Sequence, residues 1–296
     1  MTLIVGYPPD GRRRAVLHLA GMLARSSADD LVLCAVIPAQ WPPGPGRIDA
    51  EYQEFLERDA QEALEQARGR IGDDVEVTTH VHHARSVPAG LLEVVEERDA
   101  AVLVTGAFGS TVNRLLHSSH VPVAVAPHGF RAPPGARVER ATAAFGGSDD
   151  QLVVGAAGVA ARVGATLRIA SFAVRPRAPY TVAVGREADA SAVADWVDEI
   201  RASQQAALDR VSALPEVPSE CEAVVGRGED WEDALEDVDW GPGDVLVVGS
   251  SSVGPVARVF LGSRSEKIVQ HSPVPVVVVP RGVAEELASD AAAAAG

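Results

Sequence analysis

The chain alternates between short aliphatic runs and longer segments in which apolar residues recur at helical spacing. Leu31 to Ile37 predicts a buried strand, whereas Asp49 to Arg70 spaces its apolar residues among charges and predicts an amphipathic helix. The strands expected in the first half are Thr2 to Gly6, Leu31 to Ile37, Val75 to Val81, Ala101 to Thr105 and Val121 to Ala126. Strands that alternate with helices in this way predict an α/β fold with a parallel, doubly wound sheet.

The same order of elements recurs in the second half, so we expect two copies of one unit. The strands expected there are Arg140 to Phe145, Thr166 to Val174, Glu220 to Val225, Val245 to Val248 and Val274 to Val279. We predict domains at residues 1–132 and 138–282, joined by a Pro/Gly-rich linker. Residues 283–296, which end in five alanines and a glycine, are expected to be disordered.

The two copies differ in length at one place. The segment V-L-V-T-G ending at Gly106 matches V-L-V-V-G ending at Gly249, an offset of 249 − 106 = 143 residues. Beyond the next loop, the segment from Gly109 matches the segment from Gly262, an offset of 262 − 109 = 153 residues. The second copy therefore has 153 − 143 = 10 extra residues, all between its fourth strand and the following helix.

This longer loop of the second copy is the candidate ligand site. A strand that leads through a Gly/Ser turn into a helix presents backbone N–H groups and the positive end of the helix dipole to an anion, most often phosphate. The candidate phosphate ligands are Gly249, Ser250, Ser252, Gly262, Ser263 and Ser265. The alternative is a structural loop in which Ser263 only caps the helix.

Composition narrows the possible partners. The net charge of −15 argues against a nucleic-acid partner, because phosphate backbones are bound by clustered Lys and Arg. No apolar stretch reaches the ~18 residues of a membrane span, and the N-terminus does not resemble a signal peptide. We therefore expect a cytoplasmic protein without a membrane partner. Cys34 and Cys221 lack CxxC spacing and are expected to be core residues.

Both halves resemble universal stress protein domains, and the chain is similar to the tandem members of that family over nearly all of residues 1–282. The family's nucleotide binders share the frame G-x2-G-x9-G-[ST], whose four places are taken here by Gly249, Ser252, Gly262 and Ser263. The resemblance implies two five-stranded parallel domains of the adenine nucleotide alpha hydrolase-like type. It also implies ATP or another adenine nucleotide as ligand of the second copy.

The resemblance implies in addition that the two halves pair as a pseudo-dimer through their last strands, which would otherwise be apolar, open edges. The surface left over could pair two chains as a homodimer. Because the ends of parallel strands converge at one sheet edge, the nucleotide base is expected near Ser171 to Ala173, with Phe172 as its contact.

Three departures from the family pattern favour a rival interpretation. Ser252 takes the place of the second glycine of the frame, and Gly146 stands where the family's nucleotide binders have an Asp at the end of the first strand. Tyr7 is expected to be the counterpart of Gly146 in the first copy. In the rival interpretation the protein binds no nucleotide and acts through its paired domains and protein–protein interaction.

Other chemistry is not expected. His80 and His82 would share one strand face, but no acidic or cysteine partner lies at ligand spacing, which favours a solvated edge strand and no metal site. The sequence has no Ser-His-Asp arrangement, and we expect no catalytic residues. A slow nucleotide hydrolase is a third hypothesis, disfavoured because no carboxylate or Lys is evidently placed to hold Mg²⁺ or orient water. The leading interpretation is a regulatory stress protein whose partner interactions respond to nucleotide.

Overall fold

A computed structural model describes residues 1–8, 14–38, 47–147, 150–174, 186–250 and 263–294. The elements of the first half are β1 (Thr2–Gly6), α1 (Arg14–Ser27), β2 (Asp30–Pro38), α2 (Arg47–Arg68), β3 (Val77–Ala84), α3 (Val87–Glu97), β4 (Val102–Thr105), α4 (Ser110–Ser118) and β5 (Val123–Val125). Those of the second half are β6 (Arg140–Ala144), α5 (Asp150–Val163), β7 (Thr166–Val174), α6 (Arg186–Ser212), β8 (Cys221–Gly228), α7 (Trp231–Glu236), β9 (Asp244–Gly249), α8 (Ser263–His271), β10 (Val276–Val279) and α9 (Arg281–Ala293). None of the helices in these ranges is long and apolar enough to cross a membrane.

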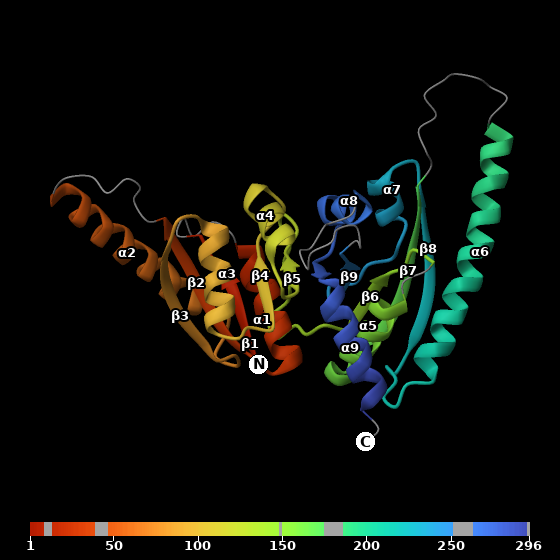
Figure 1. Cartoon of the computed structure of the whole chain (residues 1–296), viewed down its shortest axis with the longest axis horizontal. Coiled ribbons are helices and arrows are strands. Elements are labelled where there is room, and N and C mark those ends of the chain that lie inside the picture. The colour runs from red at the N-terminus through yellow and green to blue at the C-terminus, as the bar shows by residue number, and fades with distance from the viewer. Residues whose placement is uncertain (9–13, 39–46, 148–149, 175–185, 251–262, 295–296) are drawn as a thin grey trace.

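The strands of the described chain form one 10-stranded sheet in the order β3-β2-β1-β4-β5-β10-β9-β6-β7-β8 (Figure 1). The order is the same from either end, because each strand of the first half has a counterpart numbered five higher in the second. Neighbouring strands are parallel except for β5 and β10, which are antiparallel. The predicted α/β fold with a mostly parallel sheet built from two copies of one unit is therefore confirmed, but the strands of the two copies join in a single sheet.

The antiparallel seam between β5 and β10 has the register of a local two-fold axis. Ala124 lies opposite Val277, and the offset of the sequence repeat maps one onto the other, since 124 + 153 = 277. The flanking pair Val123 with Val278 is mapped in the same way onto Val276 with Val125. The two halves thus form the expected pseudo-dimer, and each covers the apolar sheet edge of the other.

Helices cover both faces of the sheet because successive strand residues point to opposite sides. In β1, Leu3 and Val5 pack with α1 residues such as Leu19. Ile4, which lies between them, packs on the other face against Leu91 of α3. This alternation explains why the strands are apolar at consecutive positions, as expected for a sheet buried on both faces.

The prediction that residues 283–296 are disordered is wrong for most of that segment. Helix α9 runs through it, and Ala284, Ala288 and Ala291 are buried. Their spacing places them on one helical face, which packs on α5. The helices approach closely because α5 has glycines there: a Cβ added at Gly158 would lie 2.6 Å from the Cβ of Ala291. The alanine-rich composition concealed a packing face of small residues.

Candidate functional site

The candidate loop of the second half begins at a topological switch point of the sheet. Strand β6 pairs with β7 on one side and with β9 on the other, so the strand order reverses at this point of the sheet. Ligands of open α/β sheets bind outside the carboxyl ends of the strands at such a point. Strand β9 ends at Gly249 and α8 begins at Ser263. The predicted ligands Ser252 and Gly262 lie outside the described residues.

Serine hydroxyls connect the elements around this loop. The Ser265 hydroxyl donates a hydrogen bond of 3.0 Å to the carbonyl of Gly249, which ties the first turn of α8 to the end of β9. Ser250 is buried, and its hydroxyl accepts the backbone N–H of Arg281 at the start of α9, at 3.1 Å. Ser263 is exposed at the first position of α8. Ser250 and Ser265 therefore connect neighbouring elements, whereas the Ser263 side chain is exposed to solvent.

The expected base contact, Phe172, lies near the end of β7 and is partly buried against an aromatic neighbour. Its ring centroid is 6.3 Å from that of Trp231, and the planes are tilted by 53°. Trp231 opens α7, which contacts α8, and the Asp230 carboxylate caps the helix by accepting the backbone N–H groups of Glu232 and Asp233. The sequence analysis did not place Trp231 beside Phe172, because this contact between α7 and β7 is not visible from positions along the chain.

Ser171, the neighbour of Phe172, has a structural role. Its hydroxyl donates to the carbonyl of Phe145 at 2.8 Å and accepts the Gln204 amide at 3.0 Å. The same amide nitrogen donates to the carbonyl of Val224 at 2.8 Å. This buried network fixes the ends of β6 and β7 relative to α6 and so positions the proposed base contact.

The end of β6 is open where the family's nucleotide binders have an Asp. Gly146 is exposed, and a Cβ added there would meet nothing within 4 Å. The assignment of Tyr7 as its counterpart is wrong by one residue. The backbone N–H of Tyr7 donates to Cys34 as that of Phe145 donates to Ala170, and both rings are buried. The counterpart of Gly146 is thus Pro8, and neither residue supplies a carboxylate.

The first half lacks the longer loop, as the repeat offsets predict. Strand β4 ends at Thr105, and α4 begins at Ser110 with Gly109 as its N-cap residue. A ligand of phosphate size would therefore meet only a short turn in this half.

A second group of polar side chains lies in the first half, away from this loop. His80 and His82 of β3 come together with Glu97 of α3, and their potential ligand atoms lie within 4.8 Å of one another. The expectation that no acidic partner is available to these histidines is therefore wrong. The expectation that they lie on an edge strand is right, because β3 is at one end of the sheet.

The fold defines a class: tandem α/β proteins whose halves meet at a pseudo-two-fold seam, with a longer connection after the fourth strand of the second half. The family model of the universal stress protein family matches residues 1–127 and 143–280. Universal stress proteins of Mycobacterium tuberculosis and Mycobacterium bovis are each 39% identical to this chain, in alignments that cover 95% of this chain and 100% of theirs. The chain belongs to the universal stress protein family.

Solved structures agree with the fold. A crystal structure of a universal stress protein from Archaeoglobus fulgidus is 20% identical, with a TM-score of 0.58, and the match covers 94% of this chain and 98% of that one. At this level of identity the likeness shows the fold alone. Domain limits at 1–132 and 138–282 stay a prediction.

Proposed function

We propose that this universal stress protein is a regulatory protein that binds ATP or another adenine nucleotide in its second half only. Binding would change its interactions with other proteins. The observation that supports this most directly is the junction of β9 and α8, where Gly249, Ser265 and Ser263 frame a longer loop at a switch point. The first half has no such loop between β4 and α4.

The chemistry around the junction suits a nucleotide. The N–H groups of the first turn of α8 and the Ser263 hydroxyl would bind phosphate oxygens, and Arg264 and Lys267 in the same exposed region add positive charge. The rings of Phe172 and Trp231 would support the base by stacking or edge contact. We assign no catalytic residues, so hydrolysis is not part of the proposal.

Isothermal titration with ATP tests the proposal with a matched pair of variants. Ser263→Asp places a carboxylate where the phosphates would lie, and Ser110→Asp makes the same change at the corresponding helix start of the first half. An Asp in a first helical turn is favoured by the helix dipole, so neither change should unfold the protein. We expect ATP binding to be lost in Ser263→Asp and unchanged in Ser110→Asp. Equal affinity in both variants and the wild type would refute the proposed site.

The open space at Gly146 allows a gain-of-function test. Gly146→Asp supplies the carboxylate that the family's nucleotide binders have at this position. A Cβ added at Gly146 meets no atom within 4 Å. One charge-assisted hydrogen bond is worth about 1.5–3 kcal/mol, so we expect affinity for ATP to rise about ten- to a hundredfold.

The rival function, protein–protein interaction without nucleotide, is favoured by Gly146 and Pro8, which leave both halves without that carboxylate. Titrations without heat for the wild type and for Gly146→Asp would support this rival. Mass spectrometry of small molecules that copurify with the wild type gives an independent measurement.

A further inference from the structure

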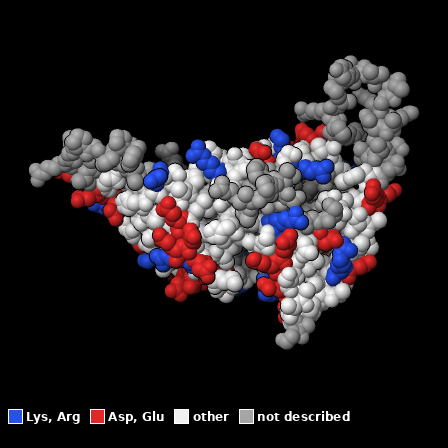
Figure 2. Space-filling view, in the orientation of Figure 1, with Lys and Arg blue, Asp and Glu red and all other residues white. Residues whose placement is uncertain are grey.

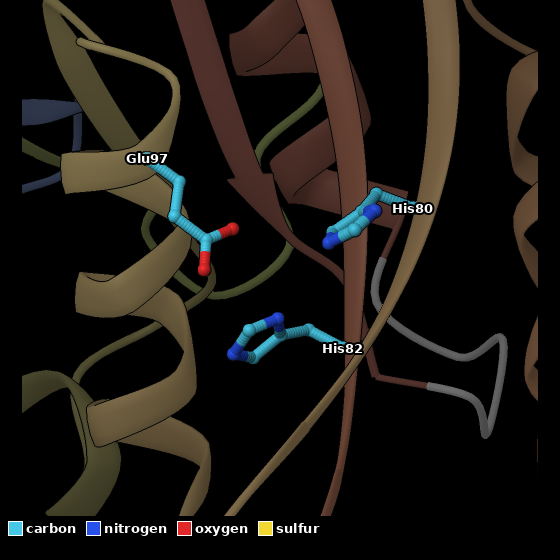
Figure 3. A group of neighbouring side chains, drawn as sticks. All are labelled: His80, His82 and Glu97. Atoms are coloured by element: carbon cyan, nitrogen blue, oxygen red, sulfur yellow. The ribbon is translucent and has the colours of Figure 1, made fainter.

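The packing of α3 on β3 brings histidine and carboxylate side chains face to face. His80 and His82 are two residues apart on a strand and share one face, while Glu93 and Glu97 are one turn apart on a helix. The chain turns back after β3, so α3 runs in the opposite direction beside it. The later carboxylate, Glu97, therefore lies near both histidines (Figure 3). The earlier one, Glu93, lies near His82.

His80 has a ring nitrogen without a partner. Its Nε2 is buried and makes no hydrogen bond within the described structure. The ring points toward the space between Glu97 and His82 in Figure 3, and Nε2 is the nitrogen at its tip. Burial, together with the nearby positive charge of Arg98, lowers the pKa of His80. A lowered pKa favours the neutral form of the ring, which is the form that binds a metal ion.

His82 is oriented for the same purpose by a carboxylate. Its Nε2 lies 2.8 Å from the Glu93 carboxylate, so that the other ring nitrogen is left to face the cluster. Metal-binding histidines commonly donate one ring N–H to a carboxylate, which fixes the ring and raises the basicity of the ligating nitrogen. The centroid of the His82 ring is 5.7 Å from that of His80.

We propose that His80, His82 and Glu97 bind a Zn²⁺ ion that links the edge strand β3 to α3. Two imidazoles and one carboxylate form a zinc-type ligand set with a fourth position for water, whereas Mg²⁺ and Ca²⁺ prefer all-oxygen sites. Ligand atoms around a tetrahedral zinc ion lie about 3.4 Å apart, given bonds of about 2.1 Å. The ligand atoms now lie within 4.8 Å of one another, so small side-chain rotations would have to bring them together on the ion, and the exposed Glu97 has room to rotate.

The surrounding charge favours a cation. Acidic side chains gather over α3 in the space-filling view (Figure 2), where Glu93, Glu96 and Glu97 are all exposed. Their field raises the local cation concentration. Cys34 of β2 is in register with His80 of β3, but its buried thiol is not among the ligand atoms that lie within 4.8 Å of one another.

The test is isothermal titration of ZnCl₂ into the full chain, with any affinity tag removed and the protein first stripped by chelator. We expect one strong site, weakened at least about a hundredfold in His80→Gln and in His82→Gln, and about tenfold in Glu93→Gln. Matched controls are His83→Gln, which removes an exposed histidine from the same strand, and Glu96→Gln, which removes an exposed acid from the same helix. Both should bind Zn²⁺ as the wild type does.

A second readout protects the test against misfolded variants. Co²⁺ should give visible absorption of the intensity typical of four-coordinate sites, and Glu97→Gln, an exposed change that leaves the fold intact, should reduce that intensity. Unchanged Zn²⁺ affinity in the His80→Gln/His82→Gln double variant would overturn the proposal. So would an equal loss in His83→Gln, or absorption typical of six water ligands in the wild type.

Discussion

Removal of helix α9 should destabilise the protein, contrary to the expectation for an alanine-rich tail. We consider a chain that stops after Gly282. The truncation removes three alanine side chains, each at most 5% exposed, from the interface with α5. Burial of each methyl group stabilises the folded protein by about 0.8 kcal/mol. Leu152 of α5 and Val279 of β10, which are buried in contact with the helix, become exposed as well.

These losses are partly offset because the residues of α9 regain conformational entropy. We therefore expect a net loss of about 2–4 kcal/mol in the free energy of unfolding. A loss of 1 kcal/mol lowers the melting temperature by about 2–4 °C for chains of roughly this size, so the decrease should be at least about 4 °C by calorimetry. A disordered tail would give a change below a degree or two. A chain that stops after Ala293 is the control and should melt as the wild type does.

A pair of point variants separates packing from chain length. Ala291 packs so closely against Gly158 that Ala291→Leu has no room for the larger side chain. Overpacking of this kind lowers the free energy of unfolding by about 1–3 kcal/mol. Ala292→Leu makes the same change at the next, exposed position. Equal melting temperatures for the two variants, or an unchanged melting temperature after truncation at Gly282, would refute the packing described for α9.

Three further changes test other parts of the fold. The buried carboxylate of Asp244 accepts hydrogen bonds of 3.0 and 2.7 Å from Arg140. Asp244→Asn removes its charge and should lower the free energy of unfolding in urea by about 3 kcal/mol. Glu216→Gln, an exposed change, is the control and should leave this free energy unchanged. The pKa of His80 is lowered in the folded state by burial, so the unfolded chain binds the proton more tightly and stability is lost as pH falls below 6.5. In the presence of chelator, His80→Gln should reduce this loss of stability at low pH. A pH profile of stability identical to that of the wild type would contradict the role of His80. Ala124→Asp places an unpaired charge in the buried seam and should cost at least about 3 kcal/mol; cooperative unfolding at the wild-type temperature would speak against the seam.

The fold was predictable because its signals are local and repeated. Each buried strand is marked by a short aliphatic run, and the same order of runs occurs twice. Even the seam was predictable, since Val274 to Val279 has no charge that would protect an open sheet edge. The end of β9 at Gly249 and the start of α8 at Ser263 were also predictable, because both boundaries are marked by local Gly and Ser residues; that a ligand binds there stays a prediction.

The features that sequence reasoning missed depend on geometry between elements. Glu97 is far from His80 along the chain and reaches it only because α3 returns beside β3. Pro8 rather than Tyr7 is the counterpart of Gly146 because of the strand register. The two segments share no residue that would fix their alignment, so the register could not be determined from the sequence. The packing face of α9 depends on glycines in a distant helix.

The same geometry limits where the two proposed ligands can bind. Following the strand register outward from β1 and β6 places Gly226 of β8 where β3 has His82. A Cβ at Gly226 would collide with the carbonyl oxygen of Ala234 in α7, so this helix packs directly on the strand and leaves no room for a histidine ring. The longer helix α3 leaves that room in the first half, whereas only the second half has the longer loop after its fourth strand. A metal ion and a nucleotide would therefore act on different halves of one continuous sheet. The halves are joined by the backbone hydrogen bonds between β5 and β10 and by packing of α4 against α8, where Leu116 and Ile268 share one buried cluster, so these contacts are the routes by which the two ligands would be coupled.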